Sequence, residues 1–130
     1  MTLTRRILAG IALALAAGSA LATYPNRPIR FIVPMAAGGP ADLTARLLAR
    51  MISDQLGQPV VVDNRSGAGG VAGTDVIAKA APDGYTIGMG TISSFGINPG
   101  LMAKLPFDAQ KDFTPIGNAS ATSGIILATR

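Results

Sequence analysis

Three short apolar runs alternate with two helical stretches along this chain of 130 residues, and this order constrains the fold more than any single motif. The runs lie at 29–33, 60–62 and 85–90, and the helical stretches lie at 41–56 and 71–81. Strand-forming residues fill the first two runs, and apolar residues recur at helical spacing between them. In the first helical stretch these are Leu43, Leu47, Leu48, Met51, Ile52 and Leu56. The sequence therefore predicts an α/β fold, a parallel or mixed sheet with flanking helices and right-handed crossovers.

The loops that follow the three strands carry polar and glycine-rich residues. They lie at 34–42, 64–70 and 91–98. Ligands of parallel sheets bind beyond the carboxyl ends of the strands, where such loops meet. We therefore expect the three loops to converge on one edge of the sheet and to form a binding site.

The first loop runs directly into a helix and suits an anion. Gly38 and Gly39 allow a close approach of the backbone, and Pro40 fits the first helical turn because its missing N–H is not needed there. The free N–H groups and the dipole of the helix start favour a phosphate or a carboxylate. Asp42 lies in the same turn, where its carboxylate either caps the helix or contacts a ligand.

The second loop has more than one interpretation. Residues 67–72, Gly-Ala-Gly-Gly-Val-Ala, formally match the G-x-G-x-x-A fingerprint of dinucleotide-binding proteins, between a strand and a helix. The acidic residue that should end the next strand is missing, because Gly90 and Thr91 stand there. We interpret the run as a glycine-rich loop for an anion or another ligand. Cofactor binding and a purely structural turn are the alternatives.

Four further polar residues lie in or beside these loops. Ser93 and Ser94 lack the G-x-S-x-G context of a hydrolase nucleophile. Asn98 precedes Pro99 and either caps the next helix or contacts the ligand. Arg65, beside the glycine-rich loop, either pairs with an anion or is a solvated charge.

The composition excludes most kinds of catalysis. The chain contains no Cys, His, Trp or Glu, so it can form no His-dependent triad, zinc–thiolate site, Cys nucleophile or disulfide. Asp42 and Asp63 could form a carboxylate pair, but nothing in the sequence tunes them for acid–base work. We predict a protein that is not an enzyme and that uses no cofactor and no metal.

The first 22 residues have the pattern of a secretory signal peptide. Arg5 and Arg6 form the basic region, 7–17 is an apolar run too short to span a bilayer, and Ala20-Leu21-Ala22 is a small-x-small cleavage site. The alternative, a first amphipathic helix, lacks a polar face. Thr4-Arg5-Arg6 leaves twin-arginine export open beside general secretion.

The charge of the chain does not favour nucleic acid. Without Arg5 and Arg6, nine basic residues face seven acidic ones, and the cations are dispersed along the sequence. Aromatic residues make up 5%, too few for a basic stripe with stacking side chains. At the other end, residues 124–130 have the pattern of a strand that stops without a cap, so we expect a truncated chain.

Seven short blocks in a fixed order resemble the Bug (TctC-like) substrate-binding proteins of tripartite tricarboxylate transporters. The blocks are 24–29, 34–42, 64–70, 80–86, 97–99, 104–108 and 111–116. The resemblance covers nearly all of the chain after the signal, with Ser66 standing where the family commonly has Pro. Family members are considerably longer and close two α/β domains around the ligand.

The resemblance implies that residues 23–130 are the N-terminal lobe of a periplasmic-binding-protein (Venus flytrap) fold whose second lobe is missing. It implies a monomeric periplasmic receptor that captures a small carboxylate and delivers it to the permease subunits of the transporter. Backbone amides and hydroxyls of the three loops would bind the ligand. By position these residues are Ala37, Gly38, Gly39, Asp42, Gly67, Ala68, Gly69, Gly70, Thr91, Ser93, Ser94 and Asn98.

Two other functions compete with this reading. The first is a fragment of a dinucleotide-binding enzyme, which binding of NAD at millimolar concentration would support. The second is a truncated chain without an independent function, because half a domain leaves a strand edge and an apolar face uncovered.

Overall fold

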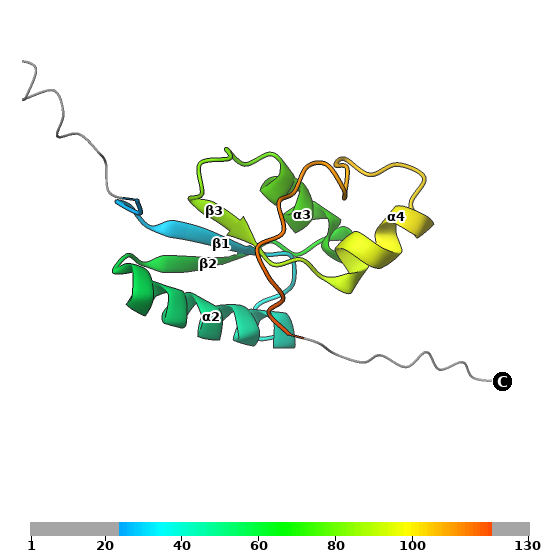
Figure 1. Ribbon diagram of the computed structural model, residues 1–130. Coiled ribbons are helices and arrows are strands. Elements are labelled where there is room, and N and C mark those ends of the chain that lie inside the picture. The colour runs from blue at the N-terminus through cyan, green and yellow to red at the C-terminus, as the bar shows by residue number, and fades with distance from the viewer. Residues whose placement is uncertain (1–23, 121–130) are drawn as a thin grey trace, which may run out of the picture.

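A parallel three-stranded sheet forms the centre of the computed structural model, which describes residues 24–120 (Figure 1). The strands are β1 (Ile29–Val33), β2 (Val60–Asn64) and β3 (Thr86–Gly88), in the order β2-β1-β3. Both neighbours pair with β1 in parallel. The predicted parallel α/β fold is therefore confirmed. The predicted signal (1–22) and last strand (124–130) lie outside the described residues.

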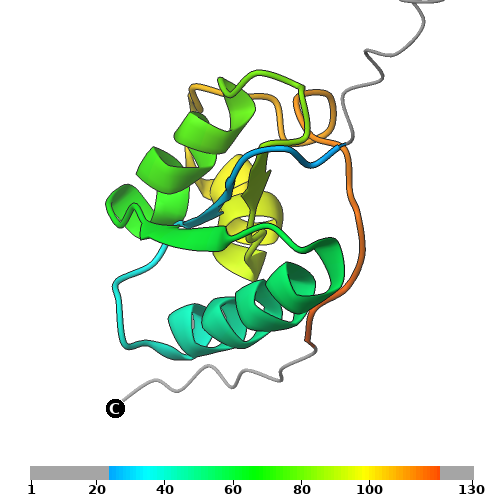
Figure 2. The same ribbon diagram turned by 90° about the vertical axis from the view of Figure 1, so that its left-hand side faces the viewer.

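Two helices cover opposite faces of the sheet, as Figures 1 and 2 show. They are α2 (Pro40–Leu56) and α3 (Val71–Ala78), and each connects two strands as a crossover. On the α2 side, Phe31 and Val33 of β1 pack against Ala45 and Ala49. This cluster is the core that fixes α2, and with it the loop that leads into α2.

Helix α2 ends at Leu56, where the predicted helical stretch also ends. Gly57 adopts the left-handed conformation (φ 65°), and its N–H donates to the carbonyl oxygen of Ser53 at 3.0 Å. A residue with a side chain would be strained at this φ, so glycine is the natural cap. The Ser53 hydroxyl donates to the Ala49 carbonyl (2.6 Å) and accepts the N–H of Val60 (2.8 Å), which joins the helix end to β2.

The apolar repeat predicted α2 but not the residues with which it faces the sheet. Leu43 and Leu47 are 62% and 63% exposed, and Met51 is 53% exposed. The small side chains of Ala45 and Ala49 are buried instead, since they let the helix backbone come close to the sheet. The larger residues form an apolar stripe on the outer side of α2.

The second half of the fold is more irregular than its sequence pattern. Helix α3 ends at Ala78 rather than Ala81, because the chain tightens into a turn in which the Ala80 N–H reaches the Ile77 carbonyl at 3.1 Å. Strand β3 spans only Thr86–Gly88 of the predicted 85–90. The strand-following loops also contain helical turns, namely η2 (Ala68–Gly70), η3 (Ser93–Ile97) and α4 (Asn98–Leu101).

The remaining chain packs through aromatic side chains. Phe113 meets Phe95 and Phe107 edge-to-face, with ring centroids 4.9 and 5.6 Å apart. Phe31 and Phe107 are buried and Phe113 is half-buried. Among residues 24–120, no helix has the length and apolar character needed to cross a bilayer.

The N-terminal lead-in is held against the turn that precedes β3. The Tyr24 hydroxyl donates to the Gly84 carbonyl at 2.7 Å, and its ring lies edge-on to Tyr85. Arg27 pairs with Asp83 at 2.8 Å and lies over the ring of Tyr85. We refer to these contacts as the Tyr24 clamp.

The tight backbone packing around Gly73 predicts a large effect of one added methyl group. A Cβ added to Gly73 would lie 2.5 Å from the Arg65 carbonyl oxygen and 2.6 Å from Pro34 Cα, both backbone atoms. We expect Gly73→Ala to lower the free energy of unfolding by about 2 kcal/mol or more, measured by urea denaturation. Gly100→Ala is the matched control, because nothing lies within 4 Å of its added Cβ. Equal stability of the two variants would contradict this packing.

Candidate functional site

The three strand-following loops meet at the carboxyl edge of the sheet, as the parallel order requires. The Arg65 N–H donates to the Val33 carbonyl (2.8 Å), and the Met89 N–H donates to the Ile32 carbonyl (2.9 Å). These bonds start the second and third loops on either side of β1. A Cβ on Gly70 would lie 3.0 Å from Ser94 Oγ and 3.5 Å from the Pro34 carbonyl, so all three loops come close at this glycine.

Asp42 organises the first loop. Its buried carboxylate accepts the N–H of Gly38 (2.8 Å), Arg46 Nε (2.9 Å) and Asn64 Nδ2 (3.0 Å). Asn64 Nδ2 also donates to the Met35 carbonyl at 3.2 Å. One carboxylate therefore ties the loop to the first turn of α2 and to the end of β2.

The contacts of Asp42 also define its electrostatics. The hydrogen bond from Arg46, followed by that from the Gly38 amide, lowers the pKa of Asp42 from 3.8 to about 2. Both carboxylate oxygens are engaged by these donors. Of the two roles that the sequence left open, the geometry favours ordering of the helix start over contact with a ligand.

The carbonyl oxygens of the glycine-rich loop all find donors within the protein. The carbonyl of Gly67 accepts the N–H of Gly70 at 2.9 Å, and the carbonyl of Ala68 accepts the N–H of Val71. The carbonyl of Gly69 accepts Asn98 Nδ2 (3.2 Å), and that of Gly70 accepts the Thr74 hydroxyl (2.8 Å).

The amides of the same loop have the opposite arrangement. In a trans peptide the N–H points away from the C=O, so inward carbonyls of Gly67 and Ala68 turn the N–H groups of Ala68 and Gly69 outward. Neither amide has a partner among residues 24–120. Positive φ values at residues 67–70 (144°, 47°, 63° and 94°) produce this shape. Successive outward amides of this kind can form an anion-binding concavity, and among residues 24–120 all four carbonyls of the loop are engaged by donors.

The third loop contributes a buried set of hydroxyls. Ser94 Oγ lies 2.9 Å from Thr74 Oγ1 and 3.1 Å from Thr91 Oγ1, and the Ser94 N–H donates to Thr91 Oγ1 (3.2 Å). Ser94 is fully buried, so its hydroxyl braces the loops from inside. Ser93 is half-buried and has no side-chain bond within residues 24–120.

The structure thus places the twelve predicted site residues in two groups. The first group is exposed or half-buried: Ala37, Gly38, Gly39, Gly67, Ala68 and Gly69 in the first two loops, and Thr91 and Ser93 in the third. The remaining four residues are buried and support this backbone: Asp42, Gly70, Ser94 and Asn98.

Asn98 does not cap its helix with its side chain. It is the first residue of α4, is 7% exposed and donates to the Gly69 carbonyl. Sequence reasoning left this contact out, as it did the roles of Asn64 and Thr74. Asn64 ends a strand, and Thr74 is a polar residue on the inner side of α3. Both polar residues are visible in the sequence, but their hydrogen-bond partners are not, because Asp42 lies 22 positions from Asn64 and Ser94 lies 20 positions from Thr74.

The cations beside the loops are already paired. Arg46 binds Asp42, and Arg65 Nε lies 3.0 Å from Asp63, whose carboxylate also accepts from Arg30. These bonds, with Arg30 first, lower the pKa of Asp63. Of the alternatives for Arg65, the geometry favours a partner within the protein. The site therefore offers amide dipoles rather than a free side-chain charge.

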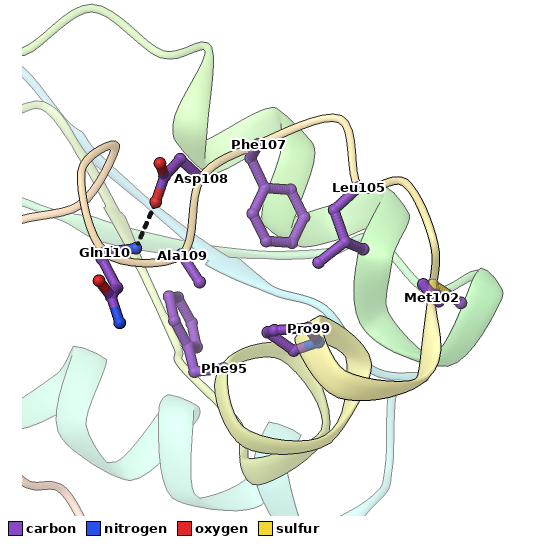
Figure 3. A pocket seen from close by; sticks show the side chains of 8 residues that line it. All are labelled: Phe95, Pro99, Met102, Leu105, Phe107, Asp108, Ala109 and Gln110. Carbon is purple, nitrogen blue, oxygen red and sulfur yellow. Dashed lines mark hydrogen bonds between the residues drawn. The ribbon is translucent and has the colours of Figure 1, made fainter.

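A separate hollow of about 450 Å³ lies beside α4 (Figure 3). Most of its lining is apolar: Phe95, Pro99, Met102, Leu105, Phe107 and Ala109, with Asp108 and Gln110. None of the predicted site residues lines it. The outward amides of the strand-following loops, and not this hollow, therefore make up the candidate site.

Comparison with protein families gives a match over most of the chain. The model of the TctC family, described as "Tripartite tricarboxylate transporter family receptor", matches residues 44–130, which include the second and third loops. Protein BugT of Bordetella pertussis is 50% identical over 95 residues, which cover 72% of this chain and 29% of BugT.

Two solved structures are similar in both sequence and fold. MatC from Rhodopseudomonas palustris with bound malate is 41% identical, and an R. palustris protein solved with adipate is 38% identical. Each aligns with a TM-score of 0.68 over 71% of this chain and 31% of its own. The chain therefore spans less than a third of the length of these relatives.

The Asp42 contacts predict a defined pH dependence of stability. Because the folded pKa is about 2 and the ordinary value is 3.8, this carboxylate stabilises the fold fully above pH 4, and the contribution is lost as the pH falls toward 2. We expect Asp42→Asn to unfold more easily at pH 7 and to lose less stability between pH 4 and pH 2 than the unsubstituted chain. Thermal unfolding across this range measures both effects.

The exposed Asp54 on α2 provides the control, as it has no ion pair within the described residues. Asp54→Asn should keep the full pH dependence of the unsubstituted chain. If the Asp42 variant and the unsubstituted chain lost the same stability between pH 4 and pH 2, Asp42 would not hold the loop through its charge.

Proposed function

Because this chain belongs to the TctC family of tripartite tricarboxylate transporter receptors, we propose that it is the first part of a receptor that binds a small carboxylate without catalysis. The observation that carries this proposal is the loop at 67–70, whose carbonyls all point inward. A surface of donors alone fits the acceptor-only oxygens of an ionised carboxylate.

The similar solved structures favour a carboxylate over a phosphate as the bound anion. The sequence alone left phosphate and carboxylate open, and the similar R. palustris structures contain adipate and malate. We infer that this chain also takes a carboxylate at its strand-following loops. Amide dipoles and the α2 start replace a charged side chain, since Arg46 and Arg65 are engaged elsewhere.

The family and the export pattern support a role in transport. We propose that residues 1–22 direct export, that residues 23–130 form the N-terminal lobe, and that the receptor is a periplasmic monomer. A second lobe of the longer protein would close over the ligand by hinge rotation and deliver it to the permease subunits.

Thermal unfolding of residues 24–130 with and without ligand tests the function. We expect malate, adipate or another small carboxylate to raise the unfolding midpoint, because only binding to the folded state does so. At about ten times the dissociation constant, the gain is about 1.4 kcal/mol. Adipamide, the neutral diamide of adipate, is the matched control and should leave the midpoint unchanged. A response to NAD alone would instead support the dinucleotide-binding alternative.

The paired state of Arg65 predicts that its charge contributes little to binding. Arg65→Ala should weaken binding of adipate less than threefold, because the guanidinium contacts Asp63 and not the outward amides. Calorimetric titration measures this change. A loss of tenfold or more would mean that Arg65 turns from Asp63 to the ligand.

A further inference from the structure

A hydrogen-bonded chain of alternating side chain and peptide groups runs through the glycine-rich loop. Asn98 Nδ2 donates to the carbonyl of Gly69 at 3.2 Å. The N–H of the same peptide belongs to Gly70, and it donates to the carbonyl of Gly67 at 2.9 Å. The N–H of that next peptide belongs to Ala68 and points out of the protein.

We propose that Asn98 is a positioning residue that orients and polarises the outward amide of Ala68 for the ligand, a role that rests on the carboxylate-binding function proposed above. Each peptide in the chain is planar and trans, so a donor held on its carbonyl fixes the direction of its N–H. Hydrogen bonds in such chains also strengthen one another, because each polarises the next. The Asn98 amide thereby increases the partial positive charge at the end of the chain.

The burial of Asn98 supports this role. The side chain is 7% exposed, and among residues 24–120 its Nδ2 has one acceptor, the Gly69 carbonyl. A Cβ on Gly69 would lie 3.8 Å from both terminal atoms of the Asn98 amide, so the side chain is in contact with this glycine and not with the helix end. A direct ligand contact is not needed for Asn98 to affect binding.

The neighbouring peptide is held independently. The Thr74 hydroxyl donates to the Gly70 carbonyl (2.8 Å) and is joined to Ser94 Oγ (2.9 Å). This bond keeps the loop attached to α3 when Asn98 is changed. The two anchors come from different elements, α3 and α4, so the effect of Asn98 can be separated from loss of the fold.

Asn98→Asp separates positioning from a structural role at the helix start. Aspartate serves the first turn of a helix at least as well as asparagine, so a structural role predicts little change. An ionised carboxylate cannot donate to the Gly69 carbonyl, so positioning predicts a defect. Asn98→Ala removes the donor without adding charge. Asn118→Asp, at an exposed asparagine, is the matched charge control.

Titration of the ¹⁵N-labelled chain, lacking only its export signal, with sodium adipate measures the effect by amide NMR. We expect the amides of Ala68 and Gly69 to shift in the unsubstituted chain. The dissociation constant should rise at least tenfold in Asn98→Asp, less in Asn98→Ala, and less than twofold in Asn118→Asp. An unchanged constant in Asn98→Asp would overturn the proposal.

A measurement without ligand keeps the two proposals distinguishable. In the free protein, loss of the Asn98 donor should move the Ala68 amide proton upfield in both Asn98 variants, although residue 98 does not bond to Ala68. If adipate shifts no amide of the unsubstituted chain, the carboxylate-binding proposal is wrong. The Ala68 shift in the free protein then still tests whether Asn98 polarises that amide. If the Ala68 proton stays in place in both variants, the positioning role is wrong even where adipate binds.

Discussion

The geometry of the binding edge depends on the buried carboxylate of Asp42. It collects donors from the loop before α2, from α2 itself and from the end of β2. Burial of a carboxylate costs desolvation free energy. Hydrogen bonds from three donors, one of them a guanidinium, offset this cost at Asp42. The contact converts an irregular run of small residues into a fixed entry to the helix. Without it, nothing else among the described residues would tie Gly38 to α2.

The second constraint is that the carbonyl oxygens of irregular backbone need hydrogen-bond donors from within the protein. In the loop at 67–70 this is achieved at positive φ, which glycine adopts freely, while Ala68 at φ 47° accepts a cost of about 1–2 kcal/mol. Because all four carbonyls are held inside, the outer face keeps only N–H groups. The proposed preference for anions therefore rests on the placement of these carbonyls and on no charged side chain.

The sequence was sufficient for the order of elements and for the edge at which the loops meet. Helical spacing and the alternation of apolar runs with helical stretches depend on residues close together in the chain, and the order of elements that they predicted is confirmed. The orientation of α2 was not predictable in the same way, because Leu43 and Ala45 both fit an apolar repeat and only the spacing between helix and sheet selects the smaller residue. The supporting roles of Asn64 and Asn98, and the bond from Thr74 to Ser94, depend on partners 20 or more positions distant, which no local pattern encodes.

The Tyr24 clamp has a practical consequence for attaching this protein to a surface. It fixes the lead-in beside the turn before β3, at the end of the strands where β1 begins, whereas the amides lie at the other end (Figure 1). The five residues of β1 separate the two ends by about 16 Å. A linker, dye or immobilising tag joined ahead of Tyr24 would therefore leave from the pole opposite the ligand. Attachment at this end would leave the strand-following loops free to contact a ligand in solution.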